Sequence, residues 1–246
     1  MVVYCSLIHC ADAAAQAAVA STATTATASN KAYPSNTPLP TIASTIVLGL
    51  GVAAGKLAVA KEFNAIREGI RNKCSNDMRW LDANAFKPSH YTGENDVGVH
   101  LTRYKPKVLH VAAHHSPEKG IEFASAYMPD DQFVAMIKIH MKHQPDILQL
   151  VVLNCCFSQA LAEQLYKAGV PVVIGTTGRV PDAWAVAFST TFYAHLAVGS
   201  TFSQALDHAR SAVEFAELPQ GQTADPDVDF VSYPPLEPGN QTNLVF

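Results

Sequence analysis

The sequence predicts an α/β fold with a mostly parallel central sheet covered by helices on both faces. Short apolar runs rich in β-branched residues alternate with longer segments that repeat apolar residues every three or four positions. Two of these runs, 147–153 and 170–174, are apolar almost throughout, which is typical of parallel strands buried on both faces. No internal repeat of about 20–50 residues is visible, so a solenoid is not expected.

Each predicted element follows from its local pattern. Strands are predicted where apolar, β-rich runs lie between polar or turn residues, at 46–52, 78–86, 108–113, 147–153 and 170–174, with shorter strands at 121–124 and 228–231. Helices are predicted where apolar residues share one face, at 57–71, 92–104, 130–142, 158–168, 181–198 and 203–218. Pro181 suits the first turn of its helix, and Gly169 and Gly199 are natural helix ends.

Composition divides the chain into three parts. Residues 11–40 are rich in Ala, Thr, Ser and then Pro, a composition that cannot build a core, so residues 1–44 are predicted to be a low-complexity, flexible leader. Residues 45–218 carry the α/β pattern, and residues 219–246 are expected to be an irregular tail. With 246 residues, 48% of them hydrophobic, the chain is long enough for one complete core.

Charge, cysteine content and hydropathy narrow the functional classes. The net charge is −4, so no basic face for nucleic acid is expected. The five cysteines are odd in number and two are adjacent, which favours free thiols and therefore a cytoplasmic location. The apolar core of the stretch at 41–60 is shorter than the roughly 20 residues of a membrane span, so no membrane association is expected.

Residues capable of chemistry follow three of the predicted strands. His114 and His115 follow the strand at 108–113, Cys155 and Cys156 come shortly after the strand at 147–153, and a glycine-bracketed loop at 175–178 follows the next strand. Ligands of open parallel sheets bind beyond the carboxyl ends of the strands. If these strands are neighbours, an imidazole and a thiol therefore meet at one edge of the sheet.

This pairing suits nucleophilic catalysis. A thiolate is the reactive form of cysteine, and a free thiol with a pKa near 8.5 is mostly protonated at neutral pH. His114 could accept the proton of Cys156 and later donate it to a leaving amine. A core role is the competing interpretation of any cysteine, and we expect it for Cys155. His110 lies inside its strand and is expected to be a packed, hydrogen-bonded residue.

Both strand-end motifs resemble those of CHAT domains, a family of caspase-like cysteine peptidases related to caspases and separase. The first family motif is a strand ending in a histidine–glycine pair, and residues 110–115 read HVAAHH here. The second is a strand ending in Leu-Asn-Ala-Cys-x-Ser, and residues 153–158 read LNCCFS. The segment 169–175 and the helical pattern from Val180 onward resemble the closing part of the family, so the resemblance covers about 45–215.

The resemblance implies a caspase-like three-layer α/β/α fold and a cysteine endopeptidase that needs no cofactor. It assigns the nucleophile to Cys156, the base to His114, and part of the oxyanion hole to the backbone N–H of His115. It also implies a protein or peptide substrate, a possible activating partner protein, and regulated proteolysis in signalling or defence. Asp182 falls at a family position that could contact substrate; an acidic residue stabilised by the dipole in the first turn of a helix is the alternative.

One departure from the family pattern leaves a second function open. His115 stands where the family has glycine, and a side chain there is strained if the backbone needs a positive φ. A catalytically inactive caspase-like interaction module is therefore the alternative to an active peptidase.

Two other kinds of site are less well supported. The segment 49–54 fits the start of a dinucleotide-binding fingerprint, but that fingerprint expects an acidic residue about 20 positions later at the end of a second strand, and Asp82 comes later and inside its predicted strand. His110, His114, His115 and Cys156 are metal-ligand types, but the sequence has no Cys-x-x-Cys or His-Glu-x-x-His spacing, so no metal is expected.

Overall fold

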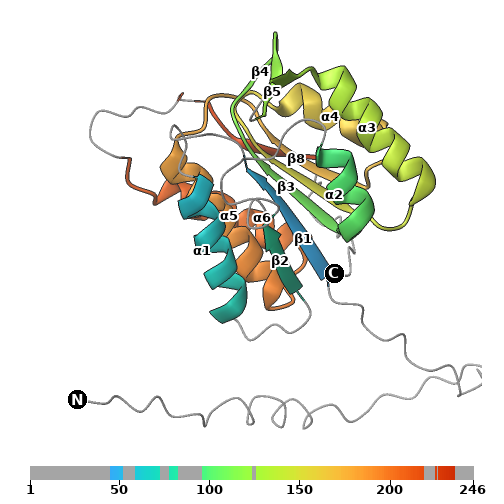
Figure 1. Ribbon diagram of the computed structural model, residues 1–246. Helices are drawn as coiled ribbons and strands as arrows, with labels where there is room; N and C mark the ends of the chain where they lie inside the picture. The colour runs from blue at the N-terminus through green and yellow to red at the C-terminus, as the bar shows by residue number, and fades with distance from the viewer. Residues whose placement is uncertain are drawn as a thin grey trace, which may run out of the picture. The chain divides into compact units, whose positions relative to one another are not determined.

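A computed structural model describes residues 45–51, 59–72, 78–82, 96–123, 126–218, 225 and 227–235. Its centre is a six-stranded sheet in the order β2-β1-β3-β7-β8-β9. The first five strands are parallel, and β9 pairs with β8 in the antiparallel sense. A small antiparallel sheet, in the order β4-β5-β6, follows β3 at the carboxyl end of the main sheet (Figure 1).

The strands and helices have the following bounds. The main sheet contains β1 (Thr45–Gly51), β2 (Met78–Asp82), β3 (Val108–Ala112), β7 (Leu150–Asn154), β8 (Val172–Thr176) and β9 (Phe230–Tyr233). The small sheet contains β4 (His115–Ser116), β5 (Gly120–Glu122) and β6 (Tyr127–Met128). The helices are α1 (Val59–Asn72), α2 (Asp96–Tyr104), α3 (Asp130–His143), α4 (Gln159–Lys167), α5 (Asp182–Ala197) and α6 (Phe202–Glu214).

Helices cover both faces of the main sheet, which confirms the predicted three-layer α/β/α class (Figure 1). Alternate residues of each strand point to opposite faces. In β7, Val151 and Leu153 pack in the core beneath α2, α3 and α4, whereas Leu150 and Val152 pack in the core beneath α1, α5 and α6. All five residues of β7 are buried, so the uninterrupted apolar run correctly predicted a strand covered on both faces.

The predicted elements are present, with shifts of a few residues at their ends. The strand predicted at 147–153 begins at Leu150, because residues 144–147 form a turn and the ladder with β3 starts at the pair Val108–Leu150. The strand predicted at 170–174 moves to Val172–Thr176, in register with β7. The short strand predicted at 228–231 is β9. The predicted leader, most of the predicted tail, and 83–86 and 92–95 lie outside the described residues.

No helix among the described ranges is long and apolar enough to cross a membrane.

Gly175 has a packing role that the sequence did not indicate. The pattern placed it in a flexible loop, but it is the fourth residue of β8. A Cβ atom at this position would lie 2.8 Å from the Cβ of Ala162 and 2.9 Å from the carbonyl oxygen of Ser158. Glycine therefore allows the start of α4, which follows the Cys156 segment, to lie directly against β8.

We expect Gly175→Ala to destabilise the protein by roughly 1–3 kcal/mol, because the new methyl group overlaps backbone that cannot easily move. Gly69→Ala is the matched control, since the nearest atom to a Cβ there is 3.6 Å away and Gly69 lies within α1. The control should be neutral or gain up to about 1 kcal/mol. Urea unfolding of both variants measures the difference, and equal stabilities would contradict this role of Gly175.

Candidate active site

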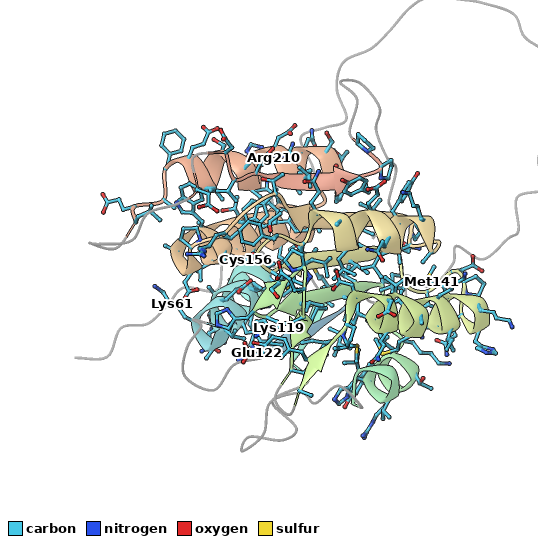
Figure 2. The ribbon with its side chains drawn as sticks, turned by 90° about the horizontal axis from the view of Figure 1, so that it is seen from above. Lys61, Lys119, Glu122, Met141, Cys156 and Arg210 are labelled. Carbon is cyan, nitrogen blue, oxygen red and sulfur yellow. The ribbon has the colours of Figure 1, made fainter. Side chains whose placement is uncertain are left out.

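The register of two neighbouring strands brings His114 and Cys156 to the same level of the sheet. β3 and β7 are adjacent and parallel, and Ala112 pairs with Asn154. His114 lies two residues beyond Ala112, and Cys156 lies two residues beyond Asn154. The adjacency on which the predicted pairing depended is therefore present. Figure 2 looks onto this end of the sheet, with Cys156 near the centre of the view.

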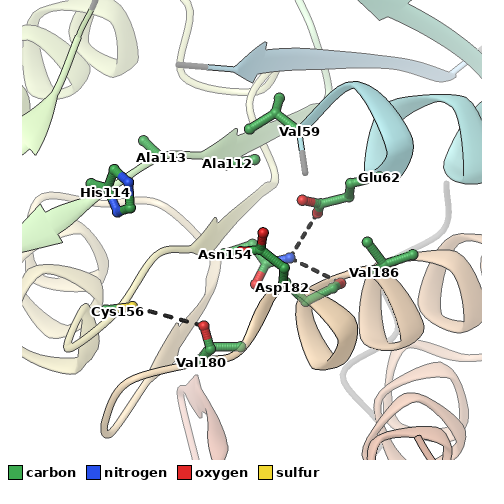
Figure 3. A pocket seen from close by; sticks show the side chains of 11 residues that line it. Val59, Glu62, Ala112, Ala113, His114, Asn154, Cys156, Val180, Asp182 and Val186 are labelled. Carbon is green, nitrogen blue, oxygen red and sulfur yellow. Dashed lines mark hydrogen bonds between the residues drawn. The ribbon is translucent and has the colours of Figure 1, made fainter. Parts of the chain in front are cut away.

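His114 and Cys156 line one cavity that opens to solvent. Its wall is formed by residues from β3, β7, α1 and the start of α5, together with the loops between them: Val59, Glu62, Ala112, Ala113, His114, Asn154, Cys156, Val180, Asp182, Ala185 and Val186. Figure 3 shows His114 and Cys156 on one side of this cavity and Glu62 across from them. Both side chains are half-buried, so each is in contact with the surrounding protein and is also accessible from the solvent.

The hydrogen bond of the Cys156 thiol is made with a backbone carbonyl and not with the imidazole. Its sulfur lies 3.9 Å from the carbonyl oxygen of Val180, to which it can donate a weak hydrogen bond (Figure 3). Within the described part of the chain, no hydrogen bond joins this sulfur to the ring of His114. Catalytic hydrogen bonds in resting enzymes are commonly long and tighten when substrate binds, so this arrangement is compatible with a dyad.

Cys155 and Cys156 occupy opposite environments. Cys155 is 2% exposed, and its sulfur lies 3.5 Å from the carbonyl oxygen of Val111 in the core. Burial raises the pKa of the Cys155 thiol far above its ordinary value. The prediction that Cys155 is a core residue is confirmed, and Cys156 is the thiol that reaches the cavity.

The turn that carries Cys156 is tightly held. Phe157 has a φ of +53°, which is unusual for a residue other than glycine, and its N–H donates to the carbonyl of Gly178 at 2.9 Å. The hydroxyl of Ser158 accepts from the N–H of Thr176 at 3.0 Å and donates to the carbonyl of Leu153 at 3.2 Å. The hydroxyl of Thr176 donates to the carbonyl of Cys155 at 2.5 Å. Buried hydroxyl groups thus fix the chain on both sides of the thiol.

A buried carboxyl group organises the other side of the cavity. Oε1 of Glu62 accepts from Nε2 of His110 at 2.9 Å, from Nδ2 of Asn154 at 2.7 Å and from the hydroxyl of Ser189 at 2.7 Å. The other ring nitrogen of His110 lies 3.1 Å from the hydroxyl of Tyr193. His110 is 0% exposed, so the prediction of a packed, hydrogen-bonded histidine is confirmed.

Glu62 is a site residue that the sequence interpretation missed. It lies on the apolar face of α1, three residues after Val59 and four before Ile66, and only 4% of it is exposed. An acidic residue at such a position is costly to bury unless it is paired, and this was the available signal.

Asp182 lies both in the first turn of α5 and on the wall of the cavity. Its place in the structure is therefore compatible with both roles that the sequence suggested, interaction with the helix dipole and contact with a substrate. Contact with a substrate remains a prediction. Asn154 contributes a second polar group to this wall, since its Oδ1 atom is buried and has no hydrogen-bond partner among the described residues.

The side chain of His115 is buried, does not line the cavity, and lies between oxygen atoms of two other residues. Nδ1 lies 2.8 Å from the carbonyl oxygen of Cys156, and Nε2 lies 3.0 Å from Oδ1 of Asp130. Burial, the largest influence, lowers the pKa of His115. The Asp130 hydrogen bond, the Cys156 carbonyl and the charges of Asp130 and Glu118 together outweigh it and leave the pKa raised above 6.5. The sequence had suggested a catalytic role for the backbone of His115 and none for its side chain.

The backbone N–H of His115 is directed away from the small sheet. His115 pairs with Ile121, and the N–H of Glu122 donates to the carbonyl of His114 at 2.8 Å. In an antiparallel ladder this makes His115–Ile121 a pair whose own N–H and C=O groups point outward. The N–H of His115 is therefore not used by β5. Its φ is not positive, so the strain foreseen for a residue other than glycine does not arise.

Comparison with known proteins agrees with this architecture. The model of the CHAT domain family matches residues 12–227, most of the chain, and the chain belongs to this family. Among curated proteins, a Roc-COR-CHAT protease from an unknown prokaryotic organism is 27% identical over 134 residues. That alignment covers 51% of this chain and 12% of the relative, so the chain spans only a small part of that protein.

We expect Glu62→Ala to destabilise the protein by roughly 3–5 kcal/mol, because it removes the one buried oxygen to which His110, Asn154 and Ser189 all donate. Glu68→Ala on the same helix is the matched control, since Glu68 is about half exposed and forms an ion pair with exposed Arg71. The control should change stability by less than about 0.5 kcal/mol. Chemical denaturation compares the two variants, and a Glu62→Ala protein as stable as the control would refute the network.

The stabilising effect of the His115 ring should depend on pH. A group whose pKa is raised by folding stabilises the folded state fully below its unfolded pKa, and this contribution is lost as pH rises through the folded pKa. The free energy of unfolding of the wild type relative to His115→Gln should therefore be greatest below pH 6.5 and decline above it. Urea unfolding between about pH 5.5 and 9 measures this difference, and a difference independent of pH would contradict the raised pKa.

Proposed function

We propose that the protein is a cysteine endopeptidase in which Cys156 is the nucleophile and His114 the general base and acid. The observation that carries this proposal is the strand register, which brings the one cavity-facing thiol of the Cys155–Cys156 pair and an imidazole to the same solvent-open cavity. Membership of the CHAT family and the protease name of the relative support the reaction class. The substrate is a protein or peptide, and no cofactor takes part.

The reaction proceeds in two half-reactions. His114 takes the proton of the Cys156 thiol, and the thiolate sulfur attacks the carbonyl carbon of the scissile peptide bond. The C–N bond then breaks, His114 gives its proton to the leaving amine, and the acyl group remains on sulfur. In the second half, His114 takes a proton from water as the water oxygen attacks the thioester. The acid product leaves, and the proton returns to sulfur.

The backbone N–H of His115 is the proposed donor to the oxyanion that forms in each half-reaction. It lies next to His114, and the ladder of the small sheet does not use it. A fixed backbone donor is worth most where charge develops away from bulk water. Asp182, on the wall of the same cavity, is the residue we propose for contact with the substrate.

The biological setting we propose is regulated proteolysis in the cytoplasm, in signalling or defence, with a possible activating partner protein. Cys155 and Cys156 are both free thiols, which is what a reducing compartment favours. The alternative is an interaction module that has lost catalysis, and the following experiment separates the two.

A thiol-directed peptidyl probe should label the wild type and Cys155→Ala, and Cys156→Ala should lose the label at this site. Cys155→Ala is the matched control because it removes the adjacent thiol and leaves the cavity intact. His114→Ala should slow labelling by roughly 10²–10⁴-fold, the usual contribution of a general base. Mass spectrometry of labelled peptides locates the modification.

Absence of labelling on wild-type Cys156 would contradict the peptidase. If a small alkylating reagent still modified Cys156 while the peptidyl probe did not, the interaction module would be favoured.

A further inference from the structure

The ring of His115 lies between two oxygen acceptors. Nδ1 faces the carbonyl oxygen of Cys156 at 2.8 Å, and Nε2 faces the Asp130 carboxyl group at 3.0 and 3.3 Å. A carbonyl oxygen cannot donate a hydrogen bond, and neither can an ionised carboxylate. With Asp130 ionised, both ring nitrogens therefore carry hydrogen, which describes an imidazolium ion paired with Asp130. The side chain of His115 is 1% exposed, so water does not replace either contact.

The charged groups around this ring favour its protonated form. Asp130 opens α3, and Glu118 lies in the turn between β4 and β5. Both raise the pKa of His115 through their negative charge, and Asp130 also accepts its hydrogen bond. On the side of β7, the ring contacts the backbone carbonyl of Cys156, a residue with a titratable thiol.

The contact acts on the peptide unit that follows the thiol. The carbonyl of Cys156 and the N–H of Phe157 belong to one planar peptide group. The ring of His115 binds the carbonyl oxygen of this peptide group, and the carbonyl of Gly178 accepts a hydrogen bond from the N–H of the same group at 2.9 Å. Phe157 has a left-handed φ of +53°, a conformation that persists in a bulky residue only when its surroundings impose it. The two hydrogen bonds supply that constraint from opposite ends of the plane.

We propose that the imidazolium ring of His115, supported by Asp130, is a positioning residue that orients the Cys156–Phe157 peptide plane and thereby directs the Cys156 thiol into the cavity. This role belongs to the side chain at the position where the family has glycine, and is separate from the oxyanion role of its N–H. Its consequence for peptide hydrolysis rests on the proposed function, whereas its effect on the reactivity of the Cys156 thiol can be measured by alkylation alone.

Loss of the ring proton should release the peptide plane. A neutral imidazole keeps one N–H, which remains on the side of the stronger, charged acceptor Asp130. The bare Nδ1 then faces the Cys156 carbonyl oxygen at 2.8 Å, and two lone pairs repel. Formation of the thiolate makes the reaction faster as pH rises, and deprotonation of His115 makes it slower. The rate should therefore pass through a maximum.

The test uses His115→Gln and Asp130→Asn in the full chain. His143→Gln and Asp131→Asn are the matched controls, because both residues are exposed and lie on the same helix as Asp130. Ring-proton NMR follows the titration of His115, and the rates of iodoacetamide alkylation and peptide hydrolysis are measured across pH. The wild-type midpoint is expected above 6.5 and should fall in Asp130→Asn.

The rates should follow the same titration. In the wild type and both controls, the high-pH decline should have the midpoint of His115. This decline should move to lower pH in Asp130→Asn. It should disappear in His115→Gln, because the glutamine amide does not titrate and can still donate a hydrogen bond. In these two variants, the displaced thiol should also lower kcat by roughly 10–100-fold relative to the wild type, with little change in KM.

Two results would overturn the inference: a His115 midpoint at or below 6.5, or variants that lose stability while keeping the pH profile of the controls. Failure of the proposed function is recognised separately. In that case peptide hydrolysis is absent in the wild type, while the alkylation rate of Cys156 still follows the His115 titration, and the positioning role stands.

Discussion

The parallel ladder between β3 and β7 is the constraint on which the candidate site depends. It pairs Ala112 with Asn154 and so fixes His114 and Cys156 at equal distances beyond the ends of two neighbouring strands. A shift of one residue would turn each side chain of β7 to the opposite face and disrupt its packing in both cores. The same packing that stabilises the sheet therefore sets the relation between the thiol and the imidazole.

Two buried polar systems reach this point from opposite helical layers. Glu62 of α1 binds Asn154 on one side, and Asp130 of α3 holds His115 against the Cys156 carbonyl on the other. Buried polar groups are stable only when they are paired, so each system favours a single arrangement of its side chains. The segment from Asn154 to Phe157 is thus held by the helices as well as by the sheet.

Rigidity near the thiol carries a local cost. Phe157 adopts an unfavourable backbone conformation, and Oδ1 of Asn154 is buried without a partner among the described residues. Strained backbone and unsatisfied polar atoms persist where the surrounding structure over-determines them, and such features gather at functional sites. Gly175 adds to this constraint by letting α4 pack directly on β8.

The sequence by itself determined the α/β class, most of the elements, and the presence of His114 and Cys156 at strand ends, because periodicity and the order of residues along the chain encode these features locally. It also indicated that Cys155 and His110 are buried. Only the tertiary structure decided which strands are neighbours and which polar groups meet. Glu62 and Asn154 are 92 residues apart, and His115 and Cys156 are 41 apart. Such contacts depend on strand order and helix packing, since a periodic pattern shows which face of an element is buried and leaves open what covers it.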